Sequence, residues 1–115
     1  MKLIIAGSRH LDITEADIDL ALIQFQLVPT MIISGGCPTG ADVAAKKYAQ
    51  SNKVEYKEFI AQWDKYGKAA GPIRNHAMSF EGDALLLIWD GKSRGSDNMR
   101  QQMKVMKKEI FEIIK

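Results

Sequence analysis

The chain has 115 residues, of which 46% are hydrophobic and 26% are charged, with a formal net charge of +2 at pH 7. This length predicts one domain, residues 1–115, and the small net charge argues against a nucleic-acid or membrane partner. Its single cysteine excludes an internal disulfide, its two histidines argue against a metal site, and no separate cofactor is indicated. No apolar run approaches the ~20 residues that span a bilayer, so we expect a soluble cytoplasmic protein.

The N-terminal third predicts a strand, a helix and a second strand. Consecutive apolar residues from Lys2 to Ala6 are typical of a parallel strand that is covered on both faces. Thr14 and Asp17 resemble a capping box at the start of a helix. The inner face of that helix is predicted to hold Ile18, Leu22 and Phe25. The run from Met31 to Ser34 predicts the second strand.

A second helix and a third strand follow. Thr39 and Asp42 repeat the capping pattern of the first helix. The predicted inner face of this second helix consists of Ala41, Ala44, Ala45, Tyr48 and Ala49. The third strand is predicted from Val54 to Phe59. The next stretch, around Trp63 and Tyr66, is too irregular to assign.

The following segment predicts a helix and the most apolar strand. Pro72 suits the first position of a helix, which would place Arg74 and Asn75 in its first turn. Helical spacing predicts an inner face of Ile73, Ala77 and Phe80. The run from Ala84 to Trp89 predicts the strongest strand, and Ser96 is predicted to cap the helix after it.

The C-terminal segment completes an alternation of strands and helices. A stripe of methionines, Met99, Met103 and Met106, is predicted to fill the core. Residues 109–114 are predicted to form a closing strand, with a continuing helix as the alternative. The alternation predicts an α/β fold: a three-layer Rossmann-like sandwich with a central, mostly parallel sheet of about five strands.

Three predicted strands end in glycine-bearing polar turns that lead into predicted helices. Such junctions lie at one edge of a parallel sheet, where helix N-termini bind anions. We therefore predict a pocket for a phosphorylated ligand, and specifically for a nucleotide. The candidate ligand-binding residues are Gly7, Ser8, Arg9, Gly35, Gly36, Gly40, Ala41, Asp42, Arg74, Asn75, Asp90, Ser93, Arg94, Gly95 and Ser96.

The turn from Gly35 to Gly40 has only half of a phosphate-binding P-loop. Ala41 and Asp42 stand where that motif needs lysine and then serine or threonine, which argues against nucleoside triphosphate hydrolysis. The turn can still offer backbone N–H groups to a phosphate, with Asp42 free to accept from a ribose hydroxyl. The alternative is that the glycines only turn the chain and Asp42 only completes a cap. We interpret Cys37 as a small loop residue rather than a nucleophile.

The combination of these motifs resembles the YspA-related family. This family belongs to the SLOG superfamily of Rossmann-like domains, which also contains the lonely-guy phosphoribohydrolases and the DprA proteins. The resemblance covers nearly the whole chain and is carried by Gly7-Ser8-Arg9, Gly35-Gly36, Gly40-Ala41-Asp42, Trp63, residues 70–75, Met78 and residues 90–96. It implies a pocket for a nucleotide or a derived ligand such as ADP-ribose, an NAD-related compound or a signalling nucleotide. Bacterial and phage members in defence settings imply a sensing or sequestering role.

One departure from the superfamily bears on catalysis. Lonely-guy enzymes carry P-G-G-x-G-T followed closely by glutamate, whereas residues 93–99 here have serine for threonine and no glutamate. Asp90 and Asp97 are the nearest carboxylates that would replace it. We therefore expect a binding module that forms a homo-oligomer, with a phosphoribohydrolase or N-glycosidase acting on nucleoside monophosphates as the alternative. Single-stranded DNA binding, as in DprA, is disfavoured by the near-neutral charge.

Overall fold

The computed structural model describes all residues, 1–115, and consists of a five-stranded sheet with helices on both faces. In chain order its elements are β1 (Lys2–Gly7), α1 (Glu15–Gln24), β2 (Met31–Ser34), α2 (Ala41–Ser51), β3 (Glu55–Glu58), α3 (Trp63–Tyr66), a short 3₁₀ turn (Gly67–Ala69), α4 (Ala70–Glu81), β4 (Ala84–Trp89), α5 (Arg94–Val105) and β5 (Glu109–Ile114). None of the helices combines the length and the apolar character that crossing a bilayer would require.

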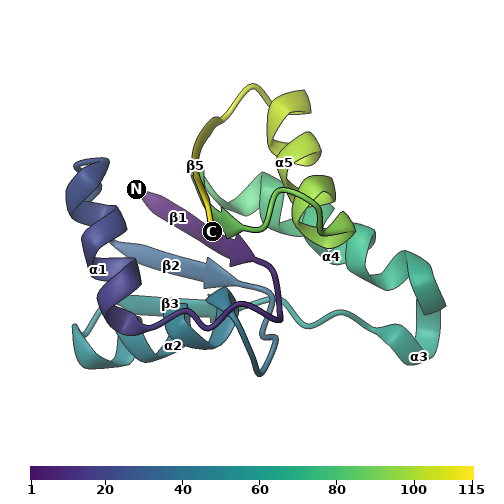
Figure 1. The fold of residues 1–115 in the computed structure, drawn as a ribbon. Coiled ribbons are helices and arrows are strands. Elements are labelled where there is room, and N and C mark those ends of the chain that lie inside the picture. Colours follow the sequence, from purple (N-terminus) through teal and green to yellow (C-terminus); the bar gives the residue numbers. More distant parts are fainter.

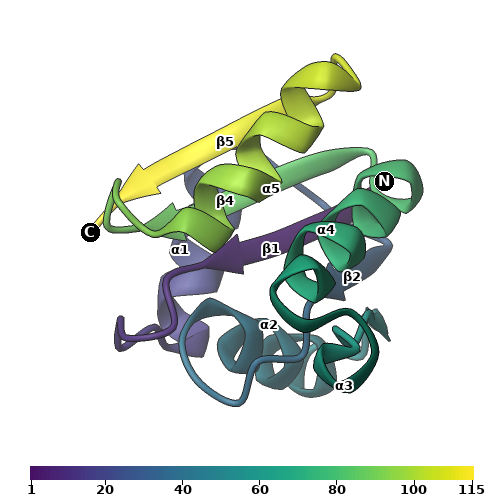
Figure 2. The same cartoon turned by 90° about the vertical axis from the view of Figure 1, so that its right-hand side faces the viewer.

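All five strands are parallel and lie in the order β3-β2-β1-β4-β5. The order reverses at β1, because the chain first builds outward through β2 and β3 and then returns to add β4 and β5 on the other side. Figure 1 shows the resulting twisted sheet, and Figure 2 shows α4 and α5 in front of it. The predicted Rossmann-like three-layer sandwich is confirmed.

Two hydrophobic cores lie on the two faces of the sheet. Alternate residues of β1 and β4 point to opposite faces, so Leu3 and Ile5 pack against α1 and α2 while Ile4 packs against α4 and α5. This arrangement explains why the central strands are apolar at consecutive positions. The first core also takes the predicted alanine face of α2, and the second takes Met99 and Met103 of α5. Met106, which was predicted to fill the core with them, is the half-buried C-cap of α5 and lies in neither core.

Several predicted boundaries and helix faces agree with the structure. The capping box of Thr14 and Asp17 opens α1, with each side chain bonded to the other residue's backbone N–H. Ile18 and Leu22 are buried, and Phe25 packs on Phe111 with ring centroids 5.2 Å apart. Residues 109–114 form strand β5, so the helical alternative is wrong. Two strands differ slightly from the prediction: β1 extends by one residue to Gly7, and β3 is shorter, Glu55–Glu58.

The prediction for α4 is wrong in both its start and its inner face. The 3₁₀ turn Gly67–Ala69 leads directly into α4, so the helix begins at Ala70 and Pro72 is its third residue. Arg74 and Asn75 consequently lie in the second turn. The predicted inner residues Ile73, Ala77 and Phe80 are exposed, and the buried face is formed by Ala70, Gly71, Asn75, Met78 and Ser79.

Candidate functional site

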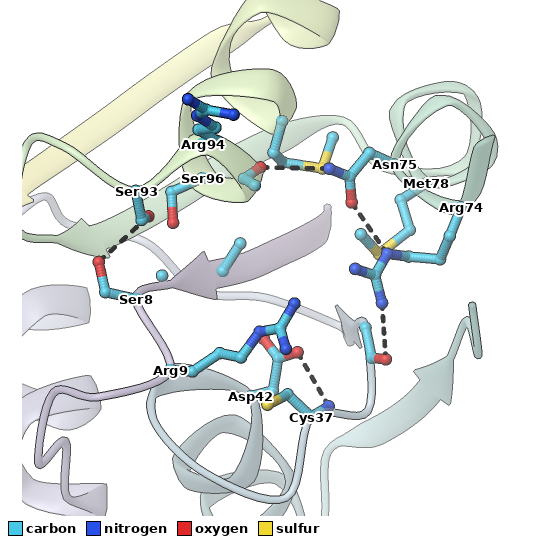
Figure 3. A pocket seen from close by; sticks show the side chains of 15 residues that line it. Ser8, Arg9, Cys37, Asp42, Arg74, Asn75, Met78, Ser93, Arg94 and Ser96 are labelled. Atoms are coloured by element: carbon cyan, nitrogen blue, oxygen red, sulfur yellow. Dashed lines mark hydrogen bonds between the residues drawn. The ribbon is translucent and has the colours of Figure 1, made fainter. Parts of the chain in front are cut away.

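A cavity of about 320 Å³ opens at the carboxyl ends of β1 and β4, where the strand order reverses. This is the position at which open α/β sheets bind ligands, because the connections diverge there and leave a crevice. The lining residues are Ala6, Gly7, Ser8, Arg9, Gly35, Cys37, Asp42, Arg74, Asn75, Met78, Ser93, Arg94, Gly95, Ser96 and Met99. Figure 3 shows this cavity, which we call the switch-point pocket.

The end of β1 forms the floor of the switch-point pocket. Gly7 lies so close to β4 that a Cβ there would overlap the carbonyl oxygen of Ile88. Ser8 is buried; its hydroxyl accepts from the backbone N–H of Asp90 at 3.1 Å and donates to the Ser93 hydroxyl at 3.2 Å. These bonds tie the turn after β1 to the turn after β4. Arg9 follows with an exposed side chain that lines the pocket.

The loop between β2 and α2 forms a second wall. Gly36 and Gly40 both adopt a φ of 73°, in the left-handed region that favours glycine. Gly40 is the N-cap of α2 and no side chain caps the helix, so the predicted cap by Thr39 and Asp42 is wrong. The Asp42 carboxylate instead accepts from the backbone N–H of Cys37 at 3.0 Å, within the loop that precedes the helix.

Asp42 is the one carboxylate among the residues that line the pocket. Burial raises the pKa of this side chain, and the Cys37 N–H and the Arg74 charge offset only part of that effect. Burial also lowers the pKa of Arg74, which nevertheless remains a cation because a guanidinium does not lose its proton in proteins. The pocket therefore contains a carboxyl group whose ionisation is disfavoured next to a permanent positive charge.

Arg74 and Asn75 join three walls of the pocket (Figure 3). From α4, Arg74 Nη1 donates to the carbonyl oxygen of Gly35 and Nε donates to Asn75 Oδ1, each at 2.9 Å. Asn75 Nδ2 continues the chain by donating to the carbonyl oxygen of Gly95 at 3.2 Å and to Asn98 Oδ1 at 3.1 Å. This network fixes the loop after β2 and the start of α5 relative to α4.

The N-terminus of α5 forms the remaining wall. Ser93 is the N-cap, so the predicted cap at Ser96 is wrong and the helix begins with Arg94. Ser96 lies in the first turn, is only 4% exposed, and its hydroxyl has no hydrogen-bond partner. Its side chain projects from α5 toward the pocket in Figure 3. Such groups are rare in native proteins, and one that points toward a cavity is a candidate contact for a ligand.

Most of the predicted ligand-binding residues line the switch-point pocket, and the exceptions are Gly36, Gly40, Ala41 and Asp90. Asp90 closes the turn before α5, because its Oδ1 accepts from the N–H groups of Lys92 at 2.8 Å and Ser93 at 2.9 Å. These two bonds lower the pKa of Asp90. Ala41 is buried in the core beneath the pocket. The binding role of all these residues stays a prediction.

Four pocket residues were not predicted: Ala6, Cys37, Met78 and Met99. Helical spacing would have found two of them. Met78 lies one turn after Arg74, and Met99 lies three residues after Ser96 in the stripe that was assigned only to the core. Ala6 precedes Gly7 at the strand end, where its position follows from that of its neighbour.

The pocket has the composition of an anion-binding site. Its cationic groups are Arg9, Arg74 and Arg94, and it adds hydroxyl donors and the first-turn N–H groups of α5, which have no partner within a helix. No cluster of three or more histidine, cysteine, aspartate or glutamate side chains suited to a metal ion is present in the structure. The arrangement favours recognition of a phosphorylated molecule through arginine and backbone donors.

Comparison with protein-family models shows which family this chain matches. The model described as "YspA, cpYpsA-related SLOG family" matches residues 1–66, which is more than half of the 115 residues. The matched part runs from β1 to the end of α3, so it contains the turn after β1 and the loop before α2. A search of curated proteins found no match.

Proposed function

The chain belongs to the YspA, cpYpsA-related SLOG family, and from this premise we propose that it binds a nucleotide or a nucleotide-derived ligand in the switch-point pocket. Membership of this family indicates nucleotide-related binding or processing. The ligand class that we propose includes ADP-ribose, NAD-related compounds and signalling nucleotides. The protein would then act as a sensor of such a molecule or as a module that sequesters it.

The observation that carries this proposal is the buried hydroxyl of Ser96. It has no hydrogen-bond partner in the structure, and it lies in the first turn of α5, at a cavity that Arg9, Arg74 and Arg94 also line. A phosphate oxygen would accept from this hydroxyl and from the free N–H groups beside it. The same oxygen atoms would neutralise Arg94 and one of the arginines on the opposite wall.

Asp42 gives the site a second type of contact. A phosphate placed against this carboxylate would be repelled, whereas a ribose hydroxyl can donate a hydrogen bond to it. We therefore propose that the phosphate lies toward α5 and the ribose toward the start of α2. The cavity of about 320 Å³ is at the lower end of the roughly 300–1,000 Å³ that is usual for small-molecule sites, which suits a mononucleotide-sized group.

The proposal is tested with a panel of phosphorylated ligands in calorimetry and thermal-shift assays. The panel contains nucleoside monophosphates, ADP-ribose, NAD and cyclic nucleotides, with adenosine as the matched control without phosphate. We expect at least one phosphorylated member to bind tighter than millimolar and adenosine to bind more weakly. Affinities no tighter than millimolar for the whole panel would refute the proposal.

A second candidate function is hydrolysis of the N-glycosidic bond of a nucleoside monophosphate. The observation in its favour is Asp42, the one carboxyl group that lines the pocket, whose pKa is raised by burial, the direction that favours a proton donor. Incubation of the protein with each monophosphate, followed by chromatography, would detect the released base. Asp42→Asn is the matched control, and unchanged substrate after long incubation with the wild-type protein would exclude this activity.

The partner expectations also stand as proposals. We propose a homo-oligomer, which is supported by the exposed apolar side chains of Ile73 and Phe80 on α4, because exposed apolar patches mark interaction surfaces. Sedimentation velocity at micromolar concentration tests this, and a single monomeric species would contradict it. We expect no nucleic-acid partner, because the net charge of +2 is too small to attract a polyanion.

A further inference from the structure

A second, smaller cavity of about 190 Å³ adjoins the switch-point pocket. Four residues line both cavities: Arg9, Gly35, Cys37 and Arg74. The two guanidinium groups therefore stand at the boundary between the cavities, and a molecule bound between them reaches into both. The second cavity, which we call the side cavity, extends away from α5 toward α3.

The lining of the side cavity that is not shared with the switch-point pocket is apolar apart from Gly36. This apolar wall consists of Pro38, Ile60, Ala61 and Trp63. Trp63 is the first residue of α3, is 49% exposed, and belongs to neither hydrophobic core. Ile60 is 63% exposed in the same wall. Because these side chains contribute little to the core, their contribution to folding does not account for an indole ring at this position.

The Trp63 ring is nevertheless held in place. A Cβ added to Gly71, in the first turn of α4, would lie 3.3 Å from Trp63 Cη2, so one edge of the ring rests against the glycine. Glycine is a poor helix former, and its value here is that it lets the ring approach the helix. An aromatic ring that is positioned in this way can stack on a planar ligand without first losing conformational freedom.

We infer that the side cavity holds the base of the nucleotide whose phosphate lies in the switch-point pocket, with the base stacked against Trp63. This inference rests on the proposed function. Stacking is sequence-tolerant because every base has a π-face, and the apolar wall offers no carboxylate or amide side chain to read a base edge. The site therefore selects for the presence of a planar ring rather than for one particular base.

The inference is tested by comparing AMP with ribose 5-phosphate, in which a hydroxyl group takes the place of the base. Both compounds are titrated into wild-type protein, Trp63→Leu and Trp63→Phe. We expect the wild-type protein to bind AMP on the order of 10-fold tighter than ribose 5-phosphate. Trp63→Leu removes this difference and leaves ribose 5-phosphate affinity unchanged, whereas Trp63→Phe retains most of it. Leu20→Ala, a change at an exposed apolar side chain of α1 that lines neither cavity, leaves both affinities unchanged.

Fluorescence provides an independent readout. The chain has two tryptophans, and Trp89 is buried with its Nε1 donating to Glu112 at 2.8 Å. We expect AMP to quench Trp63 while ribose 5-phosphate does not, and the quenching to be absent from Trp63→Phe.

The outcomes separate this inference from the proposed function. If AMP and ribose 5-phosphate both fail to bind the wild-type protein, the proposed function fails for these ligands and the inference fails with it. If AMP binds but Trp63→Leu binds it as tightly as wild type, only the inference is overturned. A Trp63→Leu variant that loses affinity equally for both compounds would also overturn the inference, because Trp63 would then act through the shape of the switch-point pocket.

Discussion

At the scale of single residues, the site combines buried side chains that bond to other parts of the protein with one buried hydroxyl that does not. The hydroxyl of Ser8 and the side chains of Arg74 and Asn75 have hydrogen-bond partners within the protein. Ser96 has none. A buried hydroxyl without a partner costs about 1–3 kcal/mol, and a ligand that accepts from it recovers that cost.

Ser96→Ala should therefore separate stability from binding. We expect its free energy of unfolding to equal or exceed that of the wild type, because the substitution removes an unsatisfied group. Affinity for AMP should fall by about 2 kcal/mol, because a bond to a charged oxygen is lost. Urea unfolding and calorimetry measure the two quantities. The control is Ser79→Ala, a buried serine outside the pocket whose hydroxyl donates to the His76 carbonyl at 2.6 Å, and it should leave affinity unchanged.

Arg74→Ala should weaken AMP binding by about 2–3 kcal/mol through loss of a charge-assisted contact. The variant also loses the bond to the Gly35 carbonyl, so its free energy of unfolding should fall by about 1 kcal/mol. Arg74→Lys should not restore affinity, because an ammonium cannot reproduce the planar fork that bonds Gly35 and Asn75 together. If the free energies of unfolding and of AMP binding fall by equal amounts, Arg74 has a structural role only.

Asp42 should contribute to the pH dependence of the free energy of unfolding. Burial raises its pKa in the folded protein above the ordinary aspartate value of 3.8, so the folded state binds this proton more tightly than the unfolded state. Wild-type protein should thus lose stability relative to Asp42→Asn as pH rises from about 4 through the raised pKa. Urea unfolding across that pH range measures the difference. If the difference in the free energy of unfolding between the two proteins is constant with pH, or changes in the opposite sense, burial does not raise the pKa of Asp42.

At the scale of elements, the strands could be predicted more accurately than the helix starts. The central strands are apolar at consecutive positions because both faces are covered, and this pattern leaves few alternative boundaries. Helix starts depend on which side chain accepts a hydrogen bond from a backbone N–H group in the first turn. Asp42 and Ser96 both stand in sequence patterns that suit a cap, but Asp42 bonds to the preceding loop and Ser96 lies inside its helix. The sequence pattern does not distinguish these arrangements.

The buried face of α4 could not be predicted for a related reason. Apolar spacing favours the side with Ile73 and Phe80, yet the helix turns Asn75 inward because that amide bonds to α5. Tertiary hydrogen bonds determine the orientation, and they are invisible in a single sequence. The convergence of the glycine turns at one pocket followed from topology alone, since all three follow parallel strands.

The two threonines of the predicted caps provide a matched test at this scale. Thr14 accepts from the N–H of Asp17 at 3.2 Å, so Thr14→Ala should lower the free energy of unfolding by about 1 kcal/mol. Thr39 precedes α2 but makes no cap, so Thr39→Ala should change it by less than about 0.5 kcal/mol. Urea unfolding compares the two, and an equal effect would mean that Thr39 does cap α2. AMP affinity should be unchanged in Thr14→Ala.

At the scale of the whole molecule, the pocket lies between two halves of the sheet. One wall belongs to β1, β2 and α2, and the other belongs to α4 and α5 beside β4. Beyond the pairing of β1 with β4, the halves already touch at the pocket through the bonds of Ser8 to Asp90 and Ser93 and through the Arg74–Gly35 bond. A ligand held by Arg9 and by the start of α5 would add a further connection between them.

AMP should therefore stabilise the entire fold rather than one loop. At an AMP concentration 100 times its Kd, mass action adds about 2.7 kcal/mol to the free energy of unfolding. For a domain of this size that corresponds to a rise in Tm of about 10 °C. Hydrogen exchange should slow on both walls, in the loop 35–40 and in the turn 90–96. Thr14→Ala should show the same AMP-induced rise in Tm from a lower starting Tm. Arg74→Ala should show little rise in Tm at the same AMP concentration, because it binds AMP more weakly. Slower exchange on one wall alone would mean that the ligand does not bridge the two halves.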